Sequence, residues 1–546
     1  MANDQIDDDA ASKTSGRDAA GPEGSSSGTS AAAPSKQEGA EPVKLAEQRL
    51  RPKQSSARTK PRRPSSTAPP AEATARAAAD KAHLLDLVRE KKRREHARDL
   101  GAEAKAPGAP LTEAAPSEPK RWLERPLPET FPEGRSAEGL SIGVVGGGIG
   151  GLAAALFLAR RGAAVTVMER SKKPEPAGAG FLLQPTGLAV LSALGLYDEV
   201  RRHGARIDRL VGKDWRGREV MDLAYARFDP RLHALGVHRG VVFEALRRAA
   251  EAAGVEFLYN TEALGGALRD KAAVLATDRG LSAQYDYVIV ADGARSRLRS
   301  ALGLAKRERP YRWACVWRVA PDPGDLLSGA VGRVLDQRYD GARRMAGILP
   351  VGQAPDDDRP HAALFWSLPA EAHAAFKEGG RDAWLRELQS FWPRFAEFVA
   401  EAPWEEPVLA LYQDAVATRP YTGRVILIGD AAHAMSPQLG QGANLALLDA
   451  HALDCAFATV TRDAVPAAYA SARRAQTAWY QRASRWLTPV FQSESTFWGA
   501  ARDRLFKPMS QTPFFRDEML AGQAGLKTGI FGRDRRDWTP GRPPPP

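Results

Sequence analysis

A glycine run in the sequence has the spacing that is typical of nucleotide binding. Gly146, Gly148 and Gly151 follow an apolar stretch, 142–145, and precede an alanine- and leucine-rich stretch. In a strand–turn–helix unit the first glycine allows a tight turn, the second lets the backbone approach a pyrophosphate, and the third lets the helix pack on the strand. The N-terminus of that helix also attracts phosphate. The spacing therefore predicts a dinucleotide site, without choosing between NAD and FAD.

An acidic residue follows the second apolar stretch, at the position where dinucleotide sites often have a ribose-binding carboxylate. Residues 164–168 form a second apolar stretch, and Glu169 ends it. A carboxylate at this position accepts hydrogen bonds from an adenosine ribose and disfavours a 2′-phosphate. We therefore assign Glu169 to the predicted cofactor site, together with Arg170 directly after it.

Two later apolar strands end in an aspartate–glycine pair. Asp292 and Gly293 follow residues 287–290, and Gly429 and Asp430 follow residues 425–428. With these pairs the sequence resembles the FAD-dependent aromatic hydroxylases of the p-hydroxybenzoate and salicylate hydroxylase type. The resemblance covers roughly 140–530. It rests on five separated motifs in the family's order: the glycine run, 178–185, 238–240, 291–299 and 429–444.

The resemblance implies roles for several residues around the flavin. Asp430 would accept a hydrogen bond from the ribityl chain. A helix beginning near Gly440 would point its free N–H groups at the pyrimidine ring, where they stabilise the reduced flavin. Arg239 would lie near the phosphates or the ribityl chain, while Asp292 would serve either flavin or nicotinamide. The full predicted set from these motifs is Arg239, Asp292, Gly293, Asp430, Ala431, Pro437, Gly440, Gly442, Ala443 and Asn444.

The activity implied by the resemblance is that of a class A flavoprotein monooxygenase. NADPH or NADH would reduce non-covalent FAD, and O2 would add at flavin C4a. The resulting hydroperoxide would transfer one oxygen to a small, electron-rich aromatic substrate. Related epoxidases, halogenases and reductases remain alternatives, although Trp313 and Trp317 are not followed by the Ile-Pro of the halogenase pattern. A flavin-binding interaction protein without turnover is the alternative outside the enzymes.

The sequence assigns no catalytic acid or base. His433 is interpreted as a residue that packs or hydrogen-bonds locally. Three arginines form either a solvated basic face or a clamp for nicotinamide phosphate: Arg295, Arg297 and Arg299. Four aromatic residues either line a pocket or fill a sheet core: Trp313, Trp317, Phe365 and Trp366.

Composition narrows the function classes. The 546 residues carry a formal net charge of +11, without the concentrated basic stripe that favours nucleic-acid binding. Two cysteines, Cys315 and Cys455, are too few for a disulfide framework or a four-cysteine metal site. They fit a reducing compartment, so we predict a cytoplasmic protein with no metal. The oligomeric state is not specified.

One uncharged stretch has the length of a membrane span. Residues 141–159 contain no charge but hold six glycines, so a strand, a turn and a helix explain them better than a span. The acidic amino terminus lacks an apolar core, and no secretory signal is expected.

The pattern along the chain predicts an α/β fold in which a Rossmann-like FAD-binding domain carries an inserted, mainly antiparallel substrate domain. No aromatic residue precedes Trp122, so the first part of the chain is predicted to be disordered and dispensable for chemistry. The predicted divisions are a tail and linker (1–136) with a charged helix near 78–100, the FAD-binding domain (137–204, 236–310 and 405–466), the substrate domain (205–235 and 311–404), a C-terminal helical segment (467–530) and a disordered end (531–546).

Overall fold

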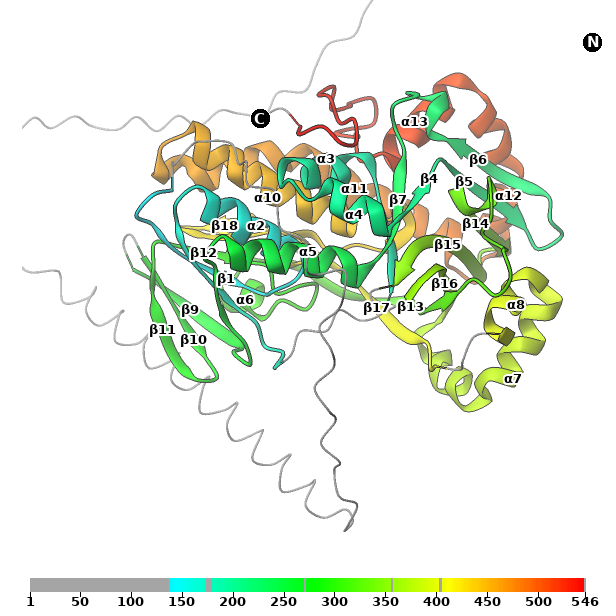
Figure 1. Cartoon of the computed structure of the whole chain (residues 1–546), viewed down its shortest axis with the longest axis horizontal. Coiled ribbons are helices and arrows are strands. Elements are labelled where there is room, and N and C mark those ends of the chain that lie inside the picture. The colour runs from blue at the N-terminus through cyan, green and yellow to red at the C-terminus, as the bar shows by residue number, and fades with distance from the viewer. Residues whose placement is uncertain (1–136, 173–178, 270–271, 355–356, 402–404, 545–546) are drawn as a thin grey trace, which may run out of the picture. The chain divides into compact units, whose positions relative to one another are not determined.

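A computed structural model describes residues 137–172, 179–269, 272–354, 357–401 and 405–544 (Figure 1). The predicted tail, its linker and the charged helix near 78–100 lie outside the described residues. The uncharged stretch 141–159 forms a strand, a turn and a helix, as its glycines predict. Within the described ranges, no helix combines the length and the apolar character that crossing a membrane requires.

The first sheet has six strands in the order β18-β19-β12-β1-β2-β8. Strand β1 lies between β2 and β12 and pairs with both in parallel. Its four consecutive residues 142–145 are buried, which is typical of a strand covered on both faces. The strands are β1 (Ser141–Val145), β2 (Ala164–Met168), β8 (Glu256–Leu258), β12 (Tyr287–Val290), β18 (Tyr421–Thr422) and β19 (Val425–Leu427).

Helices pack on this sheet and on one another. Helix α2 contacts α5, α10 and β1, and its residues from Gly151 to Leu158 are buried. A Cβ at Gly150 would lie 3.0 Å from Ala446 Cβ, so the glycine permits the close approach of α2 to α10. The helices of this part are α2 (Ile149–Arg160), α3 (Pro185–Ala193), α4 (Tyr197–His203), α5 (Arg239–Ala252), α6 (Arg297–Ala301), α9 (Asp430–His433) and α10 (Gly442–Thr459).

Two small antiparallel sheets accompany the first sheet. One has the order β3-β7-β4 and the other β11-β10-β9. Their strands are β3 (Gly180–Leu183), β4 (Ala205–Ile207), β7 (Ala234–His238), β9 (Ala263–Arg269), β10 (Ala272–Thr277) and β11 (Gly280–Tyr285). Short 3₁₀ turns occur at Tyr225–Arg227, Val331–Arg333, Ala370–Ala372, Pro437–Leu439 and Arg462–Ala464.

The large sheet has seven strands in the order β17-β13-β16-β15-β14-β5-β6, and only β14 and β5 pair in parallel. Trp366 packs edge-on against Phe391 of α7, with ring centroids 5.4 Å apart, so α7 and α8 cover one face. The elements are β5 (Arg209–Asp214), β6 (Glu219–Ala224), β13 (Ala305–Pro321), β14 (Val334–Asp340), β15 (Arg344–Ala354), β16 (Asp357–Pro369), β17 (Val408–Ala417), α7 (His373–Phe391) and α8 (Pro393–Glu401).

The strand pairing divides the chain differently from the prediction at two places. Residues 205–207 form β4 of a small sheet, although 205–235 was assigned to the substrate domain. Strand β17 (408–417) pairs with β13 of the large sheet, although 405–466 was assigned to the FAD-binding domain. Pairing between strands that are distant in sequence decides sheet membership, and the local pattern carries no sign of the partner.

The C-terminal segment forms three helices: α11 (Val465–Phe491), α12 (Thr496–Gln511) and α13 (Pro513–Gln523). Helices α12 and α13 contact β6. The predicted disorder of 531–546 is wrong for 531–544. Trp538 is 2% exposed and packs against His451 of α10. A buried aromatic anchor outweighs the proline-rich composition, while residues 545–546 lie outside the described residues.

Candidate active site

The glycine turn between β1 and α2 assigns a separate steric role to each glycine. Gly146 has φ +104°, and a Cβ there would lie 2.4 Å from the carbonyl oxygen of Ala291. A Cβ at Gly151 would lie 2.0 Å from the carbonyl oxygen of Gly146. Gly148 instead faces open space and caps α2 without a side-chain hydrogen bond. Two glycines thus allow backbone packing, and the third leaves room in front of the helix N-terminus.

The predicted ribose ligand lies beside this turn. Glu169 accepts a hydrogen bond from the Gly147 N–H at 2.8 Å through Oε2, and from the Ser171 N–H at 2.9 Å through Oε1. The carboxylate is therefore fixed at the edge of the glycine turn. Arg170 is exposed next to it.

The segment after β12 holds a polar atom without a partner. Asp292 accepts a hydrogen bond from the Arg297 N–H at 3.1 Å through Oδ2. Its Oδ1 is buried and has no hydrogen-bond partner in the described structure. Burial raises the pKa of Asp292.

The segment after β19 places a carboxylate inside the protein and facing a cavity. Asp430 lies deep in the protein. Its side chain is nevertheless accessible, because it lines the cavity described below. Burial raises the pKa of this carboxyl, although His433, Arg239 and Arg299 oppose the shift. Arg299 donates a 2.8 Å hydrogen bond from Nη1 to the carbonyl oxygen of Ala431, which fixes this turn.

The three arginines of the second motif separate in the structure. Arg299 is 1% exposed and pairs with Glu308, so it is a structural residue. Arg297 pairs with Glu262 at 3.2 Å. Only Arg295 lines the cavity. Arg299 therefore belongs to neither a clamp nor a solvated face, whereas Arg295 and Arg297 are exposed.

The N-terminus of α10 opens into the same cavity. Gly440, Gly442 and Ala443 line it, and Gln441 supplies no side-chain cap. The first N–H groups of an uncapped helix carry a positive partial charge. Gly440 has φ +60°, whereas a Cβ at Gly442 would lie 3.9 Å from Asp430 Oδ1, an ordinary contact. The turn therefore requires glycine at Gly440 for its backbone conformation and not at Gly442.

Asn444 differs from its neighbours because its side chain points away from the cavity. It is fully buried, its Oδ1 accepts a hydrogen bond from the Gln184 N–H at 2.9 Å, and its Nδ2 donates to the carbonyl oxygens of Leu182 and Gly440 at 3.2 and 3.1 Å. The side chain of Asn444 therefore has a positioning role, whereas its predicted place at the cofactor remains a prediction. Asn444 ties the loop at Gly440 to the end of β3.

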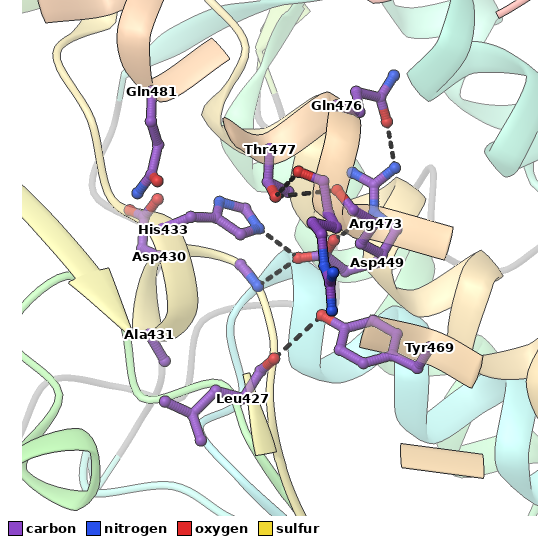
Figure 2. A network of polar contacts seen from close by, with 12 residues as sticks. Leu427, Asp430, Ala431, His433, Asp449, Tyr469, Arg473, Gln476, Thr477 and Gln481 are labelled. Atoms are coloured by element: carbon purple, nitrogen blue, oxygen red, sulfur yellow. Dashed lines mark hydrogen bonds and ion pairs between the residues drawn. The ribbon is translucent and has the colours of Figure 1, made fainter. Parts of the chain in front are cut away.

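A buried charge network supports the Asp430 turn (Figure 2). Asp449 of α10 is fully buried and accepts hydrogen bonds from His433 Nε2 at 2.6 Å, Arg473 Nε at 2.6 Å and the Gly429 N–H at 2.7 Å. Burial opposes the ionisation of Asp449, but His433 and Arg473 outweigh it and lower its pKa to about 2. His433 therefore has the local role that was predicted for it.

The sequence prediction missed Asp449 and Arg473. Asp449 could have been found in the sequence, because it is the single acidic residue in the otherwise apolar run 445–450. A charge on the buried face of a helix requires a partner. Arg473 carried no such signal, because arginines recur throughout its helix.

The aromatic residues of the large sheet lie on opposite faces. Trp317 and Phe365 line the cavity, with ring centroids 5.0 Å apart. Trp366 packs with α7 instead, and Trp313 is buried but does not line the cavity. Trp317 donates a hydrogen bond from Nε1 to the Tyr412 hydroxyl at 3.2 Å. Phe365 and Trp366 are neighbours on one strand and point to opposite faces. The predicted aromatic residues therefore divide between the cavity and the sheet core.

These features meet in one cavity of about 1190 Å³. Its lining includes the turns at Gly148, Gly293 and Asp430, together with the N-terminus of α10. It also includes one face of the large sheet and parts of α11, α12 and α13. Among the predicted cofactor residues, six do not line it: Gly146, Glu169, Arg170, Asp292, Ala431 and Asn444.

Comparison with known proteins identifies the family of this chain. A family described as "FAD binding domain" matches residues 140–486. The chain belongs to this family. A putative 2-heptyl-3-hydroxy-4(1H)-quinolone synthase of Rhodococcus erythropolis is 33% identical over 316 residues, covering 56% of this chain and 76% of that protein. A 6-hydroxynicotinate 3-monooxygenase of Bordetella bronchiseptica is 29% identical, covering 58% of this chain and 82% of that protein.

Solved structures show the same fold. Klebsiella pneumoniae HpxO, complexed with FAD and uric acid, aligns with a TM-score of 0.60 and 21% identity, over 70% of this chain and 97% of that chain. A p-nitrophenol 4-monooxygenase from Pseudomonas putida aligns with a TM-score of 0.60 and 19% identity, over 71% of this chain and 98% of that chain. The predicted family, the α/β fold and FAD as cofactor are confirmed. The protein is an FAD-dependent monooxygenase.

The residues of this flavoprotein fit FAD. Gly148 leaves open space before a helix N-terminus, and Asp430 faces the cavity. Each feature suits a different part of the cofactor, whose phosphates are anionic and whose hydroxyl groups are donors. Within the described residues, no group of three or more metal-ligating side chains is arranged to hold a metal ion.

Proposed function

We propose that the protein hydroxylates a small aromatic substrate with O2, and that NADPH or NADH supplies the electrons. One observation carries this proposal: a single cavity joins the FAD-binding turns to a wall of aromatic and aliphatic side chains. The 6-hydroxynicotinate 3-monooxygenase named above supports an aromatic substrate, as does a 3-amino-4-hydroxybenzoate 2-monooxygenase of Streptomyces cremeus that is 28% identical over 57% of this chain and 76% of that protein.

We propose that the turns divide the cofactor between them. The Gly148 turn and the N-terminus of α2 bind the pyrophosphate, and Glu169 binds the adenosine ribose. Asp430 accepts a hydrogen bond from the ribityl chain, while Arg239 balances charge nearby. The N-terminus of α10 faces the pyrimidine ring. Bound FAD supplies the redox chemistry, and the protein supplies orientation and charge.

The other wall positions the substrate and excludes water. Trp317, Phe365 and Tyr412 line the cavity, and the Tyr412 hydroxyl accepts a hydrogen bond from Trp317 Nε1. Rings pack in offset or edge-on arrangements that fix a substrate ring beside the cofactor. Apolar walls also strengthen every electrostatic contact inside the site. We also propose a cytoplasmic location, since Cys315 and Cys455 are both free thiols.

Oxygen labelling tests the proposal. The purified holoprotein is mixed with NADPH or NADH and a panel of phenols under ¹⁸O2, and NAD(P)H oxidation and product mass are followed. We expect a substrate that accelerates NAD(P)H oxidation and gains one labelled oxygen atom. Turnover without a labelled product would favour a reductase, and a halogenated product would favour a halogenase. Bound FAD without turnover on any compound would favour an interaction protein.

A further inference from the structure

The cavity has two chemically distinct parts. The cofactor part is lined by the turns and by Arg239, Arg295 and Asp430. The second part, which we call the apolar wall, is formed by the large sheet and by α11 to α13 with the segment after them. Representative side chains of this wall are Leu210, Met221, Trp317, Phe365, Phe514 and Phe531. The chemistry of the wall selects the class of substrate.

The apolar wall offers no free countercharge for an anionic substrate. Its charged lining residues are Glu518 and Lys527. Lys527 is 1% exposed and donates from Nζ to Glu518 and to the Ile530 carbonyl oxygen. Arg533 also pairs with Glu518. Burying a charge without a partner is costly, so a carboxylate in this part of the cavity would bind poorly.

The wall continues to the protein surface as exposed aromatic side chains. Phe514 is 53% exposed and Phe531 is 76% exposed, and both line the cavity. Phe514 packs edge-on against Phe515 and in a tilted arrangement against Phe531, with ring centroids 5.3 and 6.3 Å apart. A contiguous apolar patch of this kind is a mark of a binding surface. Because the patch is continuous with the cavity, one molecule can contact both.

This end of the wall lies outside the segment that matches the family. The match ends at residue 486, whereas α12, α13 and Phe531 follow it. Helices α12 and α13 contact β6, which carries Met221 of the same wall. The C-terminal segment therefore extends the cavity with side chains that the matched segment does not contain.

We propose that the substrate is a neutral aromatic compound with a long apolar extension, such as an alkyl or prenyl chain. The ring lies near Trp317 and Tyr412, and the extension follows the apolar wall to Phe514 and Phe531. This inference rests on the proposed function, because it names the substrate class of that site.

Equilibrium binding to the holoprotein tests the inference independently of turnover. Dissociation constants are measured by titration calorimetry for para-cresol, para-butylphenol and para-heptylphenol, and for a para-substituted phenol whose chain of equal length ends in a carboxylate. We expect the affinity to rise about two- to fourfold per added methylene group. The carboxylate should bind at least about tenfold more weakly than para-heptylphenol. A flat series, or tighter binding of the carboxylate, would overturn the inference.

Matched variants locate the chain. Phe531→Ser and Phe514→Ser should weaken para-heptylphenol binding several-fold more than para-cresol binding. Phe497→Ser is the control, because Phe497 is 68% exposed on α12 but does not line the cavity. Equal losses in all three variants would indicate nonspecific surface binding and overturn the inference. A flat series together with vesicle binding that Phe531→Ser abolishes would overturn it in favour of a membrane.

The two proposals fail in different ways. Phenols that stimulate NAD(P)H oxidation with affinities independent of chain length would overturn the inference alone. A steep affinity series without turnover of any phenol would overturn the proposed function, and with it the claim that the bound phenol is a substrate.

Discussion

The two parts of the cavity are built by different means. The cofactor part is formed mainly by the backbone: Gly146 and Gly151 allow close packing, and helix N-termini supply partial charge. The apolar wall is formed mainly by side chains, which come from segments between residues 210 and 531. A backbone site requires particular residues at fixed spacing, whereas a packed wall tolerates many combinations of similar volume. Substitutions should therefore act sharply in the first part and gradually in the second.

The largest loss of stability is expected at Asp449, in the buried network that supports the Asp430 turn. Asp449→Asn leaves Arg473 buried without its countercharge, which typically costs about 3–5 kcal/mol. Thermal and denaturant unfolding measure the loss. Asp454→Asn on the same helix is the control, because the side chains of Asp454 and Arg161 remain 13% and 19% exposed, so this variant should lose less stability than Asp449→Asn. Equal stability of the two variants would contradict the role assigned to the buried network.

The same network predicts a pH dependence. The pKa of Asp449 is lowered to about 2, below its ordinary value of about 4. Its contribution to stability is therefore fully present above that ordinary value and is lost as the pH falls towards the folded-state pKa. The difference in unfolding free energy between the native protein and Asp449→Asn should shrink between about pH 4 and pH 2. A constant difference across this range would show that the carboxylate is not the cause.

A smaller loss is expected at the glycine turn. Gly151→Ala forces a Cβ against the Gly146 carbonyl oxygen, and overpacking of this kind costs about 1–3 kcal/mol. Both the stability of the apoprotein and the retention of FAD should fall. Gly148→Ala should keep the stability of the apoprotein and lose FAD only, because its Cβ meets open space until the cofactor binds. The ratio of flavin to protein absorbance, with the melting temperature of each apoprotein, separates the two effects.

The sequence predicted the cofactor part because each of its signals is local. The roles of Gly146, Gly148 and Gly151 follow from strand, turn and helix within one short segment. Asn444 lies in a motif too, yet its side chain is used by Gln184 and Leu182, which are distant in sequence. A motif fixes the position of a residue and leaves the direction of its side chain open.

The apolar wall was largely beyond sequence reasoning for the same physical reason. Trp317 and Phe365 could be named as candidates, but their alternation with Trp366 has meaning only once the faces of the sheet are known. The contributions of Phe514 and Phe531 depend on how the C-terminal helices pack on β6. Trp538 was hidden by the prolines around it. Contacts between distant segments decide these placements, and no local pattern encodes them.

A moderate effect on the cofactor is expected at Asp430. Asp430→Asn removes a charge-assisted acceptor, and such a bond contributes about 1.5–3 kcal/mol, or tenfold or more in FAD affinity. Because burial raises the pKa of Asp430, its carboxylate is protonated at a less acidic pH than an ordinary aspartate. As the pH is lowered, the native protein should therefore start to release FAD at a pH above the pKa of an ordinary aspartate. The variant should show no FAD release that follows this titration. Ultrafiltration across a pH series measures both.

The smallest effect is expected in the apolar wall, at Trp317. Trp317→Phe keeps an aromatic face but removes the Nε1 donor to the Tyr412 hydroxyl. One neutral hydrogen bond contributes about 0.5–1.5 kcal/mol, and this one orients the Tyr412 hydroxyl, so phenol affinity should change by no more than about tenfold while FAD affinity stays the same. Trp313→Phe is the control, because Trp313 is buried away from the cavity and should leave phenol affinity unchanged. If Trp317→Phe released FAD as readily as Asp430→Asn, the two parts of the cavity would act as one unit, and the division between a backbone-built cofactor part and a side-chain-built wall would be wrong.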